Sequence, residues 1–258
     1  MDIELFVIGE GISEIEVYDS IKFNICRRCN LKELIYPRDM ASCKINQCLY
    51  IYDSKSFDQP KEILRVNPNG KLITKWSTGV NQGRIALSAT GEANVVLSVY
   101  VEHKVKEYSA DGLLIREVNL YSVAGHPHPH HAMKLANGDF LVCCPRLEHD
   151  QHTLCTVDAD GKLKRSFDGK CGSTFAQLKY PFYLSVDGNA CSFVMVADTM
   201  NCRVLLLDSD LQFKREILSK ESHGLRRPTK ILLDESNGRL FVADNELNNQ
   251  RILIFDFK

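Results

Sequence analysis

The amino-acid sequence predicts an all-β protein and, more narrowly, a six-bladed β-propeller. The first observation is a repeat of roughly 43 to 54 residues, in which a short apolar strand, a polar loop, a second apolar strand and a glycine turn follow one another. The second is the length, because six such repeats account for the 258 residues. The third is turn chemistry: Asp-Gly, Asn-Gly and Gly-Asn pairs separate segments rich in Val, Ile, Leu, Phe and Tyr.

The repeat is clearest in the last third of the sequence. There the strand 194–198 is followed by 203–208, and the strand 240–244 is followed by 251–256. In both copies the leading strand ends in Val-Ala-Asp. Weaker copies pair 49–53 with 63–66, 95–100 with 105–108 and 140–144 with 154–157, and a degenerate first copy pairs 5–8 with 15–18.

Each repeat is expected to form one blade of four antiparallel strands, numbered from the centre outward. The approximate blades, within a single domain of residues 1–258, are 1–36, 37–80, 81–124, 125–178, 179–225 and 226–258. The first blade lacks a clear first strand, and the last blade ends after its third strand. The sequence therefore predicts either an irregular seam between the two terminal blades or a chain cut from a longer multidomain protein.

The composition excludes a membrane-spanning or disordered chain. Hydrophobic residues make up 44%, charged residues 25%, and the net charge is −1. No apolar run approaches the roughly 18 residues that a membrane span needs. The opening Met-Asp-Ile-Glu lacks the features of a secretory signal, and the ten cysteines follow no disulfide-framework spacing. We therefore expect a soluble, monomeric, cytoplasmic domain without a membrane partner.

Four cysteines near the start of the chain superficially resemble a zinc-site spacing: Cys26, Cys29, Cys43 and Cys48. Cys26 and Cys29 fall on one predicted strand, where an odd offset points them to opposite faces. We therefore favour thiols that pack as small hydrophobic side chains.

The two clearest repeats resemble the NHL repeat, in which Val-Ala-Asp, a polar loop with Asn, and Arg at the start of an apolar strand follow one another. The residues that carry the resemblance are Asp198, Asn201 and Arg203 in one blade and Asp244, Asn249 and Arg251 in the next. The similarity fades towards the N-terminus. It implies a propeller similar to the C-terminal domain of tripartite-motif NHL proteins, which bind RNA or protein partners, and such a likeness indicates fold better than function.

Within these repeats an acidic and a basic residue stand on either side of one hairpin loop. Asp198 with Arg203, and Asp244 with Arg251, are close enough in the predicted hairpins for a carboxylate to pair with a guanidinium. We expect these pairs to stabilise the loops rather than to bind a ligand.

Function is expected on the top face, made by the loops between second and third strands and by the loops that join successive blades. The residues expected on its rim, one per blade at the entrance of each first strand, are Asp39, Arg84, His131, Tyr183 and Lys230. The flanking loops add Arg38, His128, His130, Arg226 and Arg227. Arg227 and Lys230 are both expected on exposed loops. The opposite face is predicted to be acidic.

These residues favour a non-catalytic module that binds a protein or peptide. Single-stranded RNA is the alternative, because bases stack on rings and phosphates meet Arg and Lys, although acidic residues in nearby loops reduce the basic excess. A second alternative is a metal-dependent propeller hydrolase or lyase. Arg84 and Lys230 on the rim would repel its cation, and no cofactor is expected.

The segment His126 to His131 contains four histidines and two prolines and raises a metal hypothesis. A metal site needs three or four converging donors, whereas neighbouring residues of one extended segment point in different directions. We therefore favour a polar loop whose histidines are hydrogen-bonding or pH-sensitive surface groups, and we assign no metal ligand.

Overall fold

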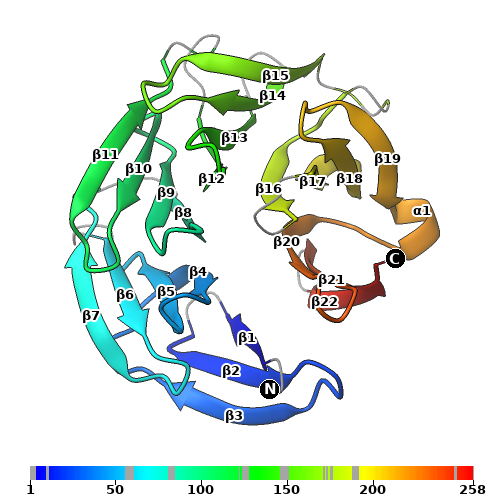
Figure 1. The fold of residues 1–258 in the computed structure, drawn as a ribbon. Coiled ribbons are helices and arrows are strands. Elements are labelled where there is room, and N and C mark those ends of the chain that lie inside the picture. Colours follow the sequence, from blue (N-terminus) through cyan, green and yellow to red (C-terminus); the bar gives the residue numbers. More distant parts are fainter. Residues whose placement is uncertain are drawn as a thin grey trace. The chain divides into compact units, whose positions relative to one another are not determined.

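The fold consists of six antiparallel β-sheets that follow one another along the chain (Figure 1). The computed structural model describes residues 4–9, 12–55, 61–80, 85–121, 123, 128–145, 151–170, 172, 174, 177–187, 192–246 and 249–257. Within them the only helical elements are the 3₁₀ turn η1 (Thr199–Asn201) and the single-turn helix α1 (Lys220–His223). The predicted all-β fold class, with one sheet per blade, is confirmed.

The chain divides into two compact units. Unit 1 comprises Met1–Val101 and Lys106–Glu117, and unit 2 comprises Glu102–Val105 and Val118–Lys258. Three sheets belong essentially to each unit. No helix in the described part of the chain is long and apolar enough to cross a membrane.

The first three sheets contain eleven described strands. The first sheet has the order β1 (Glu4–Ile8), β2 (Glu14–Asp19), β3 (Ile25–Asn30). The second has the order β4 (Pro37–Cys43), β5 (Cys48–Asp53), β6 (Glu62–Val66), β7 (Leu72–Ser77). The third is made of β8 (Ile85–Ala89), β9 (Val95–Val99), β10 (Lys104–Tyr108) and β11 (Leu114–Asn119).

The last three sheets repeat this arrangement. The fourth sheet contains β12 (His131–Lys134), β13 (Phe140–Pro145), β14 (Gln151–Val157) and β15 (Leu163–Lys170). The fifth contains β16 (Pro181–Val186), β17 (Phe193–Asp198), β18 (Arg203–Asp208) and β19 (Phe213–Leu218). The sixth contains β20 (Pro228–Asp234), β21 (Arg239–Glu246) and β22 (Asn249–Asp256).

The first and last sheets have three strands each among the described residues, and the other four sheets have four. This matches the sequence analysis, which found no first strand in the first repeat and no fourth strand in the last.

Burial explains why second and third strands are so apolar. Every residue of β5 and β9 is buried, and so are five of six in β17. Both faces of β5 and of β17 are covered by neighbouring sheets of the same unit. Within each unit, the apolar clusters bridge consecutive sheets: Tyr50 packs in a cluster with Leu97 in unit 1, and Leu141 packs in one with Leu205 in unit 2. The core therefore lies between the sheets.

The turns between third and fourth strands share one hydrogen-bond pattern. The oxygen of a short polar side chain accepts hydrogen bonds from the backbone N–H groups two and four residues later. The four residues that do this are Asn67, Ser109, Asp158 and Asp208. Two of the acidic residues predicted at this end of the strands, Asp158 and Asp208, thus have a structural role in turns.

Candidate functional site

Seven of the ten predicted binding residues belong to unit 2, and two of these, Arg226 and Arg227, lie in loops at one end of its strands. We call residues 177–180, 199–202 and 219–227, which precede β16, follow β17 and precede β20, the loop face of unit 2. Two buried carboxylates anchor these loops.

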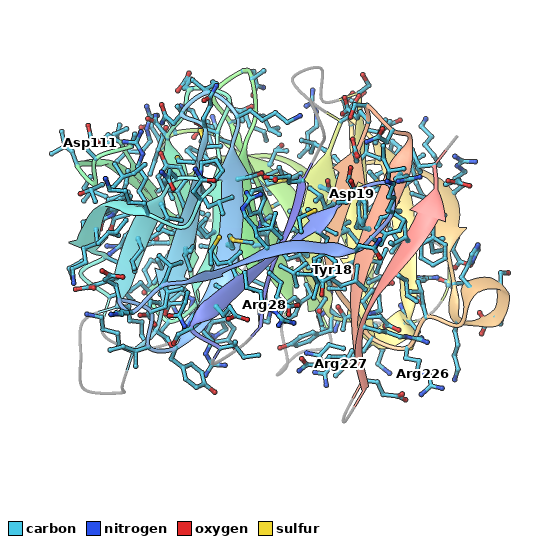
Figure 2. The ribbon with its side chains drawn as sticks, turned by 90° about the horizontal axis from the view of Figure 1, so that it is seen from below. Tyr18, Asp19, Arg28, Asp111, Arg226 and Arg227 are labelled. Carbon is cyan, nitrogen blue, oxygen red and sulfur yellow. The ribbon has the colours of Figure 1, made fainter. Side chains whose placement is uncertain are left out.

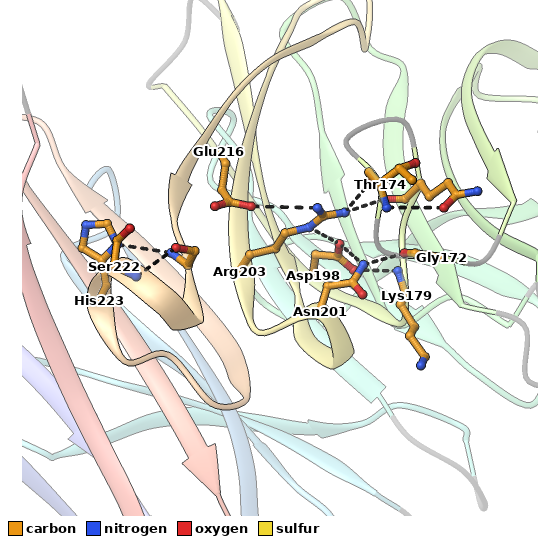
Figure 3. A network of polar contacts seen from close by, with 11 residues as sticks. Gly172, Thr174, Lys179, Asp198, Asn201, Arg203, Glu216, Ser222 and His223 are labelled. Atoms are coloured by element: carbon orange, nitrogen blue, oxygen red, sulfur yellow. Dashed lines mark hydrogen bonds and ion pairs between the residues drawn. The ribbon is translucent and has the colours of Figure 1, made fainter.

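Asp198 is the first anchor and ends strand β17 (Figure 3). Its carboxylate accepts hydrogen bonds from the Arg203 Nε at 2.8 Å, the Asn201 side chain at 2.7 Å and the Lys179 backbone N–H at 2.7 Å. Asp198 is fully buried. Desolvation raises the pKa of this carboxyl, whereas the hydrogen bonds from Asn201, Lys179 and Arg203 oppose the rise.

The partners of Asp198 reach further into the preceding loop. The Arg203 guanidinium donates to the carbonyl oxygens of Thr174 at 3.0 Å and Gln177 at 2.7 Å. The Asn201 amide donates to the carbonyl of Gly172 at 2.7 Å (Figure 3). This network ties the loop before β16 to the hairpin between β17 and β18.

Asp244 is the second anchor and makes the same kind of contacts on β21. Its carboxylate accepts from the Arg251 Nε at 3.0 Å and from a terminal nitrogen of the same guanidinium at 2.7 Å. It also accepts from the backbone N–H groups of Arg226 at 3.1 Å and Arg227 at 2.5 Å. Both pairs that the NHL resemblance singles out are thus ion pairs that fix loops.

Unit 1 contains the same carboxylate without the arginine. Asp53 is fully buried and accepts from the backbone N–H groups of Ile35 at 2.9 Å and Tyr36 at 2.7 Å. The residue opposite Asp53 is Glu62, whereas Arg203 and Arg251 stand opposite Asp198 and Asp244. This substitution cannot be recognised from the sequence, because the register of the weaker repeat is visible only in the structure.

Three predicted rim residues meet in unit 2. The ring of Tyr183 stacks on the ring of His131, with centroids 3.8 Å apart, and the Lys230 ammonium lies 5.2 Å from the Tyr183 centroid. His131 Nδ1 also accepts a hydrogen bond from the Leu184 backbone N–H at 3.3 Å. These three residues, which were predicted from equivalent positions at the start of each first strand, therefore lie close together although they come from three consecutive sheets.

Two expectations about exposure are wrong. His130 and His131 are buried, with exposed fractions of 6% and 1%, because they pack against aromatic rings of the next sheet. Lys230 lies within strand β20 and is half-buried, not on an exposed loop.

A second group of rings lies beside this stack. His130 contacts the ring of Tyr180 at 4.9 Å and that of Phe182 at 5.1 Å. His128 is half-buried, and its ring lies 4.4 Å from that of His103. His126 lies outside the described residues. Among those described, no group of three His, Cys, Asp or Glu side chains is placed to hold a metal ion.

The exposed Lys and Arg residues of the loop face are Lys179, Lys220, Arg226 and Arg227, and Figure 2 shows the two arginines side by side. The Arg226 guanidinium forms an ion pair with Glu246, which raises the pKa of Arg226. Arg227 makes no ion pair among the described residues, and the bond from its backbone N–H to Asp244 fixes the position of its Cα.

The remaining predicted residues belong to unit 1. Asp39 is half-buried, and its carboxylate accepts a hydrogen bond from the Leu87 backbone N–H at 2.8 Å, which joins the second and third sheets. The Arg38 guanidinium lies 4.3 Å from the Tyr36 ring centroid. Arg84 lies outside the described residues.

Comparisons with known proteins support the fold. No family model matches the sequence, and no curated protein matches it either. Among solved structures, a chain of the nidogen/laminin complex shares 15% identity at a TM-score of 0.70, and the match covers 98% of this chain and 89% of that one. The WD40 β-propeller domain of Doa1 shares 13% identity at a TM-score of 0.59, and the match covers 93% of this chain and 72% of that one. A streptogramin B lyase shares 13% identity at a TM-score of 0.59, and the match covers 86% of this chain and 68% of that one.

At such low identities these similarities establish the fold alone. The chain has the fold of a six-bladed β-propeller, a class that serves both binding proteins and enzymes. No family match supports NHL membership, so that resemblance rests on the Asp, Asn and Arg residues of two repeats.

Proposed function

We propose that the loop face of unit 2 is a recognition surface for a protein or peptide that carries carboxylates. The observation that carries the proposal is Arg227. Its backbone is held by the buried Asp244, its side chain is exposed, and it makes no ion pair among the described residues. Because the backbone is already fixed, binding has to order only the side chain of this residue.

The packing of the rings supports a protein partner over RNA. Binding of single strands relies on aromatic faces that stack with bases. In unit 2 the Tyr183 ring already stacks on His131 and has Lys230 beside it, and His130 is buried. Glu246 neutralises Arg226, which leaves less positive charge for phosphates.

The same contacts support a non-catalytic role. His131 is buried and its Nδ1 accepts the Leu184 N–H, so this nitrogen is not available as a general base. One of the similar structures is a nidogen/laminin complex, an assembly of two proteins. A chain with a similar fold thus takes part in a complex between two proteins.

The test begins with selection of binders from a displayed peptide library by the purified chain. The affinity of an enriched peptide is then measured for the natural protein and for Arg227→Glu. We expect a loss of at least about tenfold, as for a central charged contact, with no change in thermal midpoint. The control is Arg215→Glu, the same charge change on the exposed outer strand β19.

An equal loss of peptide affinity in both variants, or no loss in Arg227→Glu, would contradict the proposal that the loop face binds the peptide. A parallel selection from a pool of short single-stranded RNAs at two salt concentrations tests the alternative. Enriched RNA motifs whose affinity falls as the salt concentration rises would contradict the hypothesis of a protein partner and favour the hypothesis of an RNA partner.

A further inference from the structure

The sixth sheet ends at a strand whose sequence matches an inner strand. β22 contains Arg-Ile-Leu-Ile-Phe-Asp at 251–256, and the third strand of the fifth sheet, β18, contains Arg-Val-Leu-Leu-Leu-Asp at 203–208. The registers agree as well, because Arg251 pairs with Asp244 as Arg203 pairs with Asp198. β18 is covered by β19, whereas no described strand pairs with the outer edge of β22.

Because no described strand covers the outer edge of β22, its residues are more exposed than the equivalent residues of β18. Val204 in β18 is fully buried, and its equivalent Ile252 is 42% exposed. Ile254 is 37% exposed as well. The side chain of Arg203 is 5% exposed and that of Arg251 is 31% exposed. An apolar strand with an open edge is a template for pairing with another strand.

The complete sheets show what kind of strand covers such an edge. Their fourth strands share an apolar first residue, a polar or basic centre and an apolar fifth residue. The four sequences are Leu-Ile-Thr-Lys-Trp from residue 72, Leu-Ile-Arg-Glu-Val from 114, Leu-Lys-Arg-Ser-Phe from 163 and Phe-Lys-Arg-Glu-Ile from 213.

Two charges on β19 meet charges on β18 that are repeated on β22. Lys214 forms an ion pair with Asp208 at 2.7 Å, and Glu216 lies 3.9 Å from Arg203. Asp256 and Arg251 occupy the positions of Asp208 and Arg203. A covering strand with Lys at its second position and Glu at its fourth would complement both.

We propose that the outer edge of β22 is a docking site for an extended peptide segment of a partner protein, with the pattern apolar-Lys-x-Glu-apolar. The segment adds to the sixth sheet as an antiparallel fourth strand, its Lys facing Asp256 and its Glu facing Arg251. Backbone hydrogen bonds supply affinity, and the two charges set the register. The site shares Arg251 with the contacts that hold the loop face, since this guanidinium also donates to the Gly224 carbonyl, but the proposal does not depend on the function proposed for that face.

The test uses a labelled synthetic peptide that copies residues 212–218 of this chain, Gln-Phe-Lys-Arg-Glu-Ile-Leu. Binding to the full chain is followed by fluorescence anisotropy and by hydrogen exchange. We expect saturable binding and slower exchange at 250–256, with no change at 203–208. A peptide with the exchanged charges K214E and E216K should bind about five- to tenfold more weakly, as expected for two exposed ion pairs.

A charge swap across the interface gives the sharper test. Asp256→Lys should weaken the original peptide and restore the binding of a K214E peptide. Asp160→Lys, the same change on an exposed turn of the fourth sheet, should alter neither affinity. A backbone N-methylated peptide should not bind, because it cannot complete the strand ladder.

Three results would overturn the proposal. One is the absence of protection at 250–256 with the peptide in excess. Another is equal binding of the N-methylated or charge-exchanged peptides. The third is protection of β22 without peptide that grows with protein concentration, which would assign this edge to a second copy of the chain.

Discussion

The buried carboxylates at the ends of second strands show how one residue type is stabilised in two ways. Asp198 and Asp244 each combine backbone N–H donors with an arginine from the third strand. Asp53 is held by backbone N–H groups, and Glu62 stands where the arginine would be. Glu62 instead pairs with Lys55 at 2.7 Å. The carboxylate is therefore common to the three sheets, and the arginine is not.

Replacing Asp198 should strongly destabilise the protein. Asp198→Ala leaves the Arg203 guanidinium buried without its carboxylate, and breaking one side of such a pair costs about 3–5 kcal/mol. Asp210→Ala, on an exposed turn of the same sheet, should change the free energy of unfolding by less than about 0.5 kcal/mol. Urea unfolding followed by circular dichroism measures both. Similar values for the two variants would contradict a stabilising role for the pair.

At the scale of single elements, the turns between strands depend on glycines in the left-handed region. Gly138 has a φ of 87° and Gly161 a φ of 81°. A Cβ on Gly138 would meet no atom within 4 Å, whereas one on Gly161 would clash with the carbonyl oxygen of Asn119. Both positions have a backbone conformation that is strained for a residue with a Cβ. They differ in the space that is open to that Cβ.

This pair separates strain from steric clash. Gly138→Ala should cost about 1–2 kcal/mol, the penalty of a left-handed conformation for a residue with a Cβ. Gly161→Ala should cost more, because the Asn119 carbonyl belongs to the backbone of another strand and cannot rotate away. Thermal unfolding of both variants measures the difference. Equal costs would show that the turn relaxes around the added methyl group.

The turn before β19 should give the protein part of its acid sensitivity. The ion pair with Lys214, followed by the hydrogen bond from the Gln212 N–H, lowers the pKa of Asp208 below 3.8. A carboxyl with a lowered pKa in the folded state stabilises that state above its unfolded pKa. This contribution is lost as the pH falls through the folded value.

Asp208→Asn keeps an oxygen that can accept the turn's hydrogen bonds, as Asn67 does in the second sheet. The variant should therefore lose less stability than the natural protein when the pH falls below about 4. Thermal midpoints at pH 7 and pH 3 give the comparison. An identical loss in both proteins would assign the acid sensitivity to other carboxyls.

For the molecule as a whole, the sequence was sufficient for features that depend on local spacing. The strands, the turns and the pairing of Asp198 with Arg203 follow from residues a few positions apart. The burial of His130 and His131 depends on rings from the next sheet, and the place of Glu62 opposite Asp53 depends on register. These features require packing between elements, which the repeat pattern alone does not specify.

Because consecutive sheets pack against each other within each unit, stability should vary along the chain as in other repeat proteins. β18 and β22 offer a matched comparison, since their sequences and registers are alike and only β18 is covered by a fourth strand. In the free protein we expect amides of 251–256 to exchange faster than those of 203–208. Native-state hydrogen exchange read by mass spectrometry measures both segments in one sample. Equal protection would contradict this expectation. It would mean that pairing with β21 and the packing of apolar side chains protect β22 as well as two neighbouring strands protect β18.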